Sequence, residues 1–242
     1  MYGRNHVANF RPAREGYLVH SIFYTIQGEG PWAGWPAIFI RFAGCNLRCS
    51  WCDTEFEQNA AVLSLAALLD HIIVLSEDCR CTRLVLTGGE PLLQGIYLLL
   101  LSLPLRFQVQ IETAGTVWGP DESGAKLGNA LLRLDAWIVC SPKTPKVHRA
   151  VIHHTNAWKY ILRAGQIDEN DGLPTGSTQF EGCTDGKSVY RPHPNNSVPI
   201  YVHPCDDGDA VRNAHNLRAA ADSALKYGYR LGVQMHKLVG LP

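Results

Sequence analysis

The sequence predicts an α/β fold, an incomplete TIM-like β/α barrel built mostly of parallel strands. Short apolar runs rich in β-branched and aromatic residues alternate along the chain with segments that repeat apolar side chains at helical spacing. At 242 residues, the chain is slightly short for a full eight-fold barrel. We therefore expect a single domain over residues 1–242, with an N-terminal extension at 1–16 and a loop insertion at 165–197.

The predicted strands are short apolar runs, most of them followed by polar or glycine-containing turns. They are expected at 37–42, 83–87, 107–112, 137–140, 158–162, 200–203 and 229–235. Functional residues of barrel-like folds collect at the carboxyl ends of the strands. The polar groups that directly follow these runs are therefore the first candidates for a site.

Helices are predicted over 65–75, 92–101 and 209–228. Ser64 offers an N-cap for the first, and Pro104 stops the second. Asp209 caps the third, and Gly228 closes it. The apolar residues of the third helix that share one face, and that we expect to meet the core, are Val211, Ala214, Leu217, Ala221 and Leu225.

The bulk composition excludes several classes of protein. The formal net charge is zero, so no nucleic-acid partner is implied. The N-terminus lacks the apolar core of a signal peptide, and no apolar run is long enough to cross a membrane. We expect a cytoplasmic protein, in which the eight cysteines act as thiols or ligands rather than as disulfides.

Cys45, Cys49 and Cys52 lie in one short run directly after the predicted strand 37–42. Cubane iron–sulfur clusters normally take four thiolates, so a loop with three leaves one iron free to bind another ligand. The alternative is a structural zinc loop, for which Cys79 and Cys81 could supply the missing ligands.

Two charged residues lie at strands that are otherwise apolar. Arg41 needs an anion, either an internal carboxylate or one carried by a ligand. Glu112 ends a strand, and a buried carboxylate is costly without a partner. A ribose or an ammonium group of a ligand would serve as that partner, and so would an ion pair with Lys143 or with Arg41.

Three further segments admit both a binding and a structural interpretation. The glycine pair in 87–91 allows a ligand to approach the backbone, or simply forms a tight turn. The run 27–31 fails as a dinucleotide fingerprint because no strand is predicted before it, but its amide and carboxylate could bind the edge of a pterin or purine. The apolar terminus 236–242 is expected to tuck inward and to bring its carboxylate to a ligand.

Together these motifs resemble the radical S-adenosylmethionine enzymes and, among them, the 7-carboxy-7-deazaguanine synthase family. The stretches that carry the resemblance are 23–30, 41–54, 87–91, 112–113, 141–143 and 236–242. The resemblance implies a partial barrel of the radical S-adenosylmethionine type. It also implies a lyase of queuosine and 7-deazapurine biosynthesis, which contracts the ring of 6-carboxy-5,6,7,8-tetrahydropterin to 7-carboxy-7-deazaguanine and releases ammonia.

The same resemblance implies cofactors and the residues that hold them. A 4Fe-4S cluster would be held by Cys45, Cys49 and Cys52, and a magnesium ion by Thr54. The residues implied for S-adenosylmethionine are Trp51, Asp53, Gly89, Glu90, Glu112, Ser141, Pro142, Lys143 and His203. The residues implied for the substrate are Ile26, Gln27, Gly28, Glu29, Arg41, Thr87, His236 and Pro242. His203 departs from the glutamine that is common among relatives.

The resemblance also implies partners: the pterin substrate, an electron donor such as flavodoxin or ferredoxin, and a second copy of the chain in a homodimer. Neither a nucleic acid nor a membrane is expected. Two other functions compete with this interpretation. One is a radical-forming activase that acts on a glycyl radical protein, and the other is a zinc-stabilised binding module.

Overall fold

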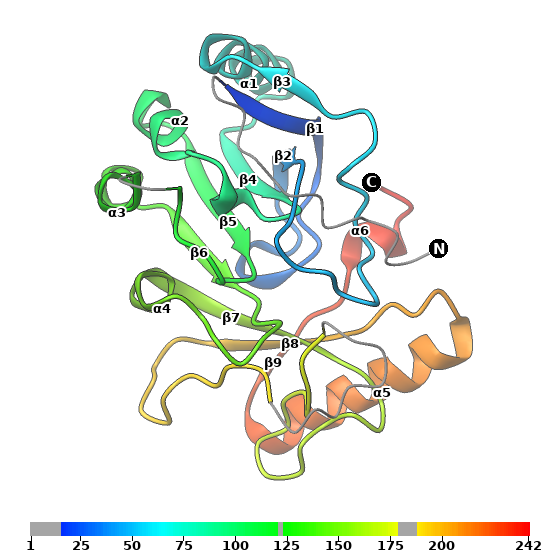
Figure 1. Cartoon of the computed structure of the whole chain (residues 1–242). Coiled ribbons are helices and arrows are strands. Elements are labelled where there is room, and N and C mark those ends of the chain that lie inside the picture. The colour runs from blue at the N-terminus through cyan, green and yellow to red at the C-terminus, as the bar shows by residue number, and fades with distance from the viewer. Residues whose placement is uncertain (1–15, 121–122, 179–187) are drawn as a thin grey trace.

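A nine-stranded sheet forms the framework of the computed structural model, which describes residues 16–120, 123–178 and 188–242 (Figure 1). The strand order is β3-β1-β2-β4-β5-β6-β7-β8-β9. The strands are β1 (Tyr17–Ile26), β2 (Pro36–Phe42), β3 (Ala61–Leu63), β4 (Arg83–Gly88), β5 (Gln108–Thr113), β6 (Trp137–Cys140), β7 (Thr155–Leu162), β8 (Ile200–Pro204) and β9 (Arg230–Leu231). From β2 to β9 all neighbours are parallel, whereas β1 is antiparallel to both β2 and β3. The predicted α/β fold with an open, mostly parallel sheet is confirmed.

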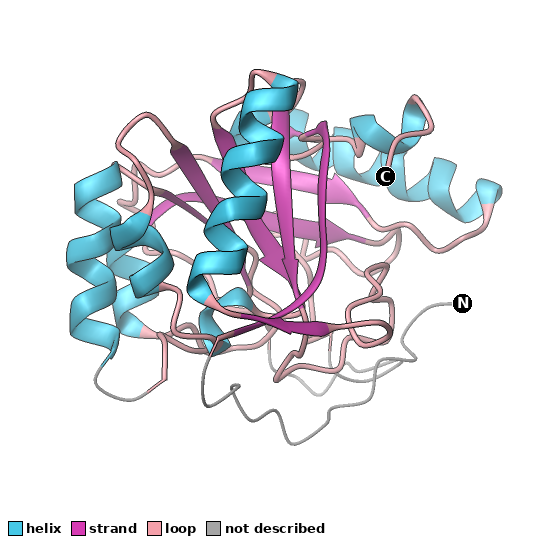
Figure 2. Cartoon of the chain, turned by 90° about the horizontal axis from the view of Figure 1, so that it is seen from above, coloured by secondary structure: helices cyan, strands magenta, loops and turns pink. Residues whose placement is uncertain are grey.

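Helices pack outside the curved sheet, as the view from above shows (Figure 2). They are α1 (Leu65–Cys79), α2 (Tyr97–Ser102), α3 (Ser123–Leu134), α4 (Arg149–His154), α5 (Ala210–Tyr227) and α6 (Met235–Leu238). Short 3₁₀ turns lie at Gly30–Trp32 and Pro91–Leu93. Within the described residues, none of the helices combines the length and apolar character needed to cross a bilayer.

The predicted caps of two helices are confirmed. The Ser64 hydroxyl accepts a hydrogen bond from the Ala67 amide at the start of α1. The Asp209 carboxylate accepts one from the Arg212 amide at the start of α5, and Gly228 ends that helix in the left-handed conformation. These signals are local in the chain, so the sequence alone carries them.

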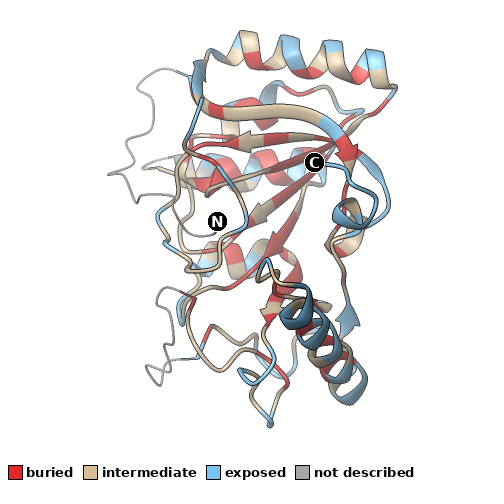
Figure 3. Cartoon of the chain, turned by 90° about the vertical axis from the view of Figure 1, so that its right-hand side faces the viewer, coloured by how far each residue is buried: buried red, intermediate tan, exposed pale blue. Residues whose placement is uncertain are grey.

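The predicted core face of α5 is wrong. Leu225 is 84% exposed and Val211 66% exposed, and the outward face of this helix is largely pale blue in Figure 3. The residues that α5 buries are Asn216, Ala220, Ser223 and Ala224. Asn216 donates to the Cys205 carbonyl and accepts from the Ala164 amide, and these hydrogen bonds fix the rotation of the helix. Polar anchoring thus overrides the apolar periodicity.

Other boundaries also differ from the prediction. The expected helix over 92–101 is a 3₁₀ turn followed by the short α2, because the buried Gln94 side chain bonds both the amide and the carbonyl of Leu18 in β1. The expected last strand over 229–235 is reduced to β9 and passes into α6. Strands β1 and β3 and helices α3 and α4 were not among the predicted elements. A strand therefore does precede Gln27, although it belongs to an antiparallel hairpin.

The described parts of the expected loop insertion, 165–178 and 188–197, contain no helix and only an isolated bridge between Ile167 and Pro174. The rest of that segment, and all of the expected N-terminal extension except Gly16, lie outside the described residues.

The glycine pair after β4 allows two backbone segments to touch. At Gly88, with φ +124°, a Cβ atom would lie 2.0 Å from the Phe42 carbonyl oxygen. At Gly89 a Cβ atom would lie 2.0 Å from the Gly44 carbonyl oxygen. The amide of Gly89 donates to Phe42, and the amide of Glu90 donates to Gly44. The turn therefore supports the start of the cysteine loop.

Gly88→Ala is expected to lower the free energy of unfolding by more than about 3 kcal/mol, because it combines a forbidden φ with a clash against backbone that cannot move aside. Urea unfolding followed by circular dichroism measures this loss. Gly165→Ala is the matched control, since Gly165 also has a positive φ but nothing lies within 4 Å of its Cβ position. It should lose only about 1 kcal/mol. Equal losses in the two variants would contradict the close-approach explanation.

Candidate active site

A cavity of about 470 Å³ opens at the carboxyl ends of the parallel strands. Most of the predicted site residues line it: Ile26, Gln27, Glu29, Arg41, Cys45, Cys49, Trp51, Cys52, Asp53, Thr54, Thr87, Gly89, Glu112, Ser141, Lys143, His236 and Pro242. The four predicted site residues outside the lining are Gly28, Glu90, Pro142 and His203. Parallel strands bring their carboxyl ends to one edge of the sheet, so residues from distant parts of the chain meet there.

The three clustered cysteines occupy the loop that follows β2, on the wall of this cavity. The Cys45 sulfur accepts from the Leu47 amide at 3.4 Å, and the Cys52 thiol donates to the Thr54 carbonyl at 3.6 Å. Burial raises the pKa of Cys45 to about 12 and that of Cys52 to about 11. Their thiolate forms therefore need the positive charge of a bound metal.

This donor set fits an iron–sulfur cluster. Three thiols face one cavity, and no disulfide joins the seven cysteines within the described ranges. In those ranges no three histidine, cysteine, aspartate or glutamate side chains are close enough together to hold an ion. The thiols would have to turn from their local partners towards a cluster. Three thiolates would then leave one cluster iron for a fourth ligand.

Two other segments, around Thr178 and around Lys143, contact the cysteine loop. The Thr178 hydroxyl lies 3.0 Å from the Cys49 sulfur, and the Thr178 carbonyl accepts from the Ser50 amide. The Thr178 amide in turn donates to the Lys143 carbonyl. The Lys143 ammonium lies 4.7 Å from the centre of the Trp51 ring and donates to the Ser141 hydroxyl. The segment predicted as an insertion therefore contacts the cysteine loop directly.

Glu90 lies beneath the cavity rather than in its wall. It is fully buried, and its oxygens accept from the Thr113 hydroxyl at 2.7 Å and from the amides of Leu92 and Ala114. Burial raises the pKa of Glu90 to about 7. The carboxylate thus joins the end of β4 to the end of β5. Within the Gly-Gly-Glu motif, the two glycines, Gly88 and Gly89, line the cavity, and Glu90 does not.

Arg41 lacks a partner for part of its guanidinium group. Its Nε atom is buried, and no acceptor among the described residues lies within hydrogen-bond distance of it. The guanidinium carbon lies 5.2 Å from the centre of the Phe23 ring, and burial lowers the pKa of Arg41. A buried donor without a hydrogen-bond partner costs free energy. A carboxylate is the partner whose geometry matches a guanidinium group best. The cavity therefore offers an anion site at this position.

Lys159 is a site residue that the sequence analysis missed. Its ammonium donates to Glu29 at 2.7 Å and to Glu112 at 2.6 Å, and all three side chains line the cavity. The partner of Glu112 is thus Lys159 and not Lys143 or Arg41. The signal was available, because Lys159 lies within an apolar strand just as Arg41 does.

Glutamine amides complete this buried group. Glu112 accepts from Gln110 at 2.7 Å and from Gln27 at 3.3 Å. Burial lowers the pKa of Lys159, but the two carboxylates outweigh it and raise that pKa. Burial likewise raises the pKa of Glu29, and Lys159 more than reverses this effect. Burial keeps the pKa of Glu112 above its ordinary value. With two carboxylates, Glu29 and Glu112, and one ammonium, Lys159, the group has a net negative charge.

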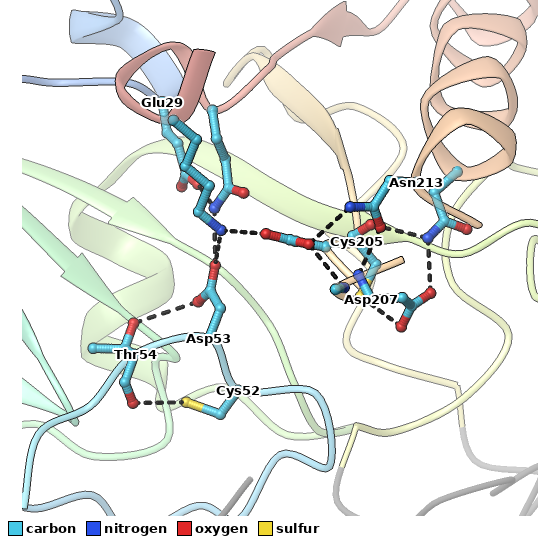
Figure 4. A network of polar contacts seen from close by, with 12 residues as sticks. Glu29, Cys52, Asp53, Thr54, Cys205, Asp207 and Asn213 are labelled. Carbon is cyan, nitrogen blue, oxygen red and sulfur yellow. Dashed lines mark hydrogen bonds and ion pairs between the residues drawn. The ribbon is translucent and has the colours of Figure 1, made fainter. Parts of the chain in front are cut away.

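The chain after β9 returns to the cavity and binds the cysteine loop. Gln234 donates to Glu29 and to Asp53, both at 2.9 Å. The Lys237 ammonium lies between Asp53 at 2.9 Å and Asp206 at 2.7 Å, within the polar network of Figure 4. Gln234, Lys237 and Asp206 were not predicted as site residues. Their partners lie 31 to 205 positions away in the chain, so no local pattern reveals them.

The last residues only partly fulfil the expectation that the terminus tucks inward. Pro242 lines the cavity, and its carbonyl accepts from the Thr25 hydroxyl at 3.2 Å. Leu238 and Val239, however, are exposed at 77% and 64%. Gly28 lies against His236, where a Cβ atom would come within 2.0 Å of the imidazole Nδ1.

His203 is fully buried at the end of β8, packed against Gly232, and neither ring nitrogen has a partner among the described residues. Burial lowers its pKa to about 4, so the ring is neutral.

Known proteins are similar to this chain over most of its length. The model of the Radical SAM superfamily matches residues 39–167. A 7-carboxy-7-deazaguanine synthase of Rhodospirillum rubrum is 43% identical over 99% of both chains. One of Rickettsia prowazekii is 35% identical over 92% of this chain and 88% of its own.

The crystal structure of QueE from Escherichia coli superposes with a TM-score of 0.61 over 90% of this chain and 93% of that one. At 22% identity, this match shows a shared fold. Together with relatives that are similar along nearly the whole chain, these matches show that the chain belongs to the 7-carboxy-7-deazaguanine synthase family of radical S-adenosylmethionine enzymes.

Proposed function

We propose that this chain contracts the ring of 6-carboxy-5,6,7,8-tetrahydropterin to 7-carboxy-7-deazaguanine with release of ammonia, as a carbon–nitrogen lyase of queuosine and 7-deazapurine biosynthesis. The observation that carries the proposal is the cavity itself. Cys45, Cys49 and Cys52 line it together with Arg41, whose buried Nε has no partner among the described residues. A substrate that bears a carboxylate would satisfy Arg41 and lie beside the cluster loop.

The residues that would hold the cluster are Cys45, Cys49 and Cys52. A reduced cluster with S-adenosylmethionine on its free iron would supply the radical that takes a hydrogen atom from the substrate. The chain's own part is to orient the two ligands and to exclude water from the space between them. Most of the cavity's parallel-strand wall is buried or half-buried, which suits this task.

The substrate end would be formed by the turn after β1 together with Arg41. The Gln27 amide and the Glu29 carboxylate can pair with the donors and acceptors along the edge of a pterin ring. Arg41 would clamp the substrate carboxylate from the adjoining strand. Ile26, Gly28, Thr87, His236 and Pro242 would complete this end.

The cofactor end would be formed by the strand ends nearer to Lys143. Glu112 offers an acceptor for ribose hydroxyls, and the Gly89 carbonyl is suited to an ammonium group. The remaining contacts are assigned to Trp51, Asp53, Glu90, Ser141, Pro142, Lys143 and His203. Glu90, Pro142 and His203 lie outside the cavity lining, so their part would be to support the residues that line it.

Thr54 would bind magnesium through its hydroxyl, together with substrate oxygens and water, since Mg²⁺ prefers oxygen ligands and keeps several waters. The hydroxyl lies 3.4 Å from Asp53 at the cavity wall. We further propose a cytoplasmic homodimer that receives its electron from a donor such as flavodoxin or ferredoxin.

Arg41→Gln is expected to raise the KM for the carboxylated pterin roughly tenfold to a hundredfold, the cost of losing charge-assisted hydrogen bonds. Steady-state kinetics of the reconstituted enzyme under anaerobic conditions measure it. Arg83→Gln is the control, because Arg83 begins β4 at the opposite end of the sheet and stacks on Trp35. An unchanged KM in Arg41→Gln would refute the carboxylate clamp.

Anaerobic reconstitution should give about four irons per chain and a brown protein. Alanine at Cys45, Cys49 or Cys52 should abolish iron binding, as measured by metal analysis and absorption spectroscopy. Cys79→Ala combined with Cys81→Ala should leave the iron content unchanged. A colourless protein with stoichiometric zinc, lost in the Cys79 and Cys81 double variant, would establish the zinc module instead.

A further inference from the structure

One ammonium group connects the two ends of the cavity. Lys159, in β7, is 8% exposed and donates both to Glu29, in the turn after β1, and to Glu112, at the end of β5. The proposed function places Glu29 against the pterin and Glu112 against S-adenosylmethionine. No other described residue forms ion pairs with both carboxylates.

Both carboxylates keep room for a ligand. An ionised carboxylate has about four acceptor positions. Glu29 uses two of them, for Lys159 and Gln234. Glu112 uses three, for Lys159, Gln27 and Gln110. Each carboxylate can therefore still accept a further hydrogen bond from a bound molecule.

The shared ammonium links the positions of the two carboxylates, since it lies 2.7 Å from Glu29 and 2.6 Å from Glu112. Three charged side chains lie together out of water, where any displacement that lengthens one ion pair is costly. A ligand that immobilises one carboxylate therefore also immobilises Lys159 and, through it, the second carboxylate. The second ligand then meets a partner whose freedom has already been lost, which favours its binding.

We infer that Lys159 is a positioning residue that couples the two ligands, so that S-adenosylmethionine tightens the binding of the pterin and the pterin tightens the binding of S-adenosylmethionine by the same factor. The inference rests on the proposed function, because it needs one ligand on each carboxylate. It assigns to Lys159 a role in coordinating the two ligands rather than in the chemical step.

The test is a binding measurement without a reductant, so that no turnover occurs. The dissociation constant of 6-carboxytetrahydropterin is measured by anaerobic titration calorimetry of the reconstituted protein, with and without saturating S-adenosylmethionine. For the unaltered protein we expect S-adenosylmethionine to tighten pterin binding roughly fivefold or more. In Lys159→Met this factor should fall to nearly one. In Lys159→Arg, which retains a buried cation, it should recover above the Lys159→Met value.

Two further variants separate coupling from general damage. Lys126→Met removes an exposed lysine on α3 that stacks on Tyr97, and it should retain the full coupling factor. If Lys159→Met does not fold, Lys159→Gln, which removes the charge but keeps a hydrogen-bond donor, is measured in its place. Recovery of the coupling factor in Lys159→Arg distinguishes positioning from a structural role. A merely structural defect would weaken pterin binding equally with and without S-adenosylmethionine, so the ratio of the two dissociation constants would not change.

The outcomes discriminate between the two claims. If the unaltered protein binds both ligands and shows no coupling, or if Lys159→Met keeps the same factor, the role of Lys159 is refuted and the proposed function stands. If the unaltered protein binds neither ligand, the proposed function fails, and the coupling falls with it.

Discussion

The ion group of Lys159, Glu29 and Glu112 constrains much of this molecule. Removing three charges from water costs several kcal/mol for each ion, and this cost is offset only where the geometry is good and the remaining acceptors are bonded. The cavity supplies further hydrogen bonds to the two carboxylates: Gln27 and Gln110 donate to Glu112, and Gln234 donates to the Glu29 oxygen that does not contact Lys159. The turn after β1, the ends of β5 and β7, and the segment after β9 must therefore reach their places together.

The cysteine loop depends on a second, purely steric constraint. Gly88 and Gly89 allow the end of β4 to meet the backbone at Phe42 and Gly44, and the buried Glu90 then joins this turn to β5. These contacts use no ligand. They support the start of the cysteine loop through backbone contacts, whereas polar side chains from other segments contact the loop elsewhere.

Features that depend on neighbouring residues, such as helix caps and buried strands, could be predicted from the sequence. Contacts between distant parts of the chain could not. The caps Ser64, Asp209 and Gly228 and the buried parallel strands could be predicted because each depends on a few neighbouring residues. Strand β1 was missed because it has partners on both sides and a mixed burial pattern, which hides the alternation. The face of α5 was misassigned because hydrogen bonds from Asn216 set its rotation. In the site, strand-end residues could be foreseen, whereas Gln234 and Lys237 reach it only through the folded chain.

The open side of the sheet is closed by side chains and not by a strand ladder. Between the turn after β1 and the segment after β9, the links are the Gln234 amide to Glu29, the Thr25 hydroxyl to Pro242, and the backbone bond from Met235 to Gly28. Each such bond contributes only about 1 kcal/mol net. The contacts that join the turn after β1 to the segment after β9, beside the cavity, are therefore independent of the strand pairing that holds the sheet together.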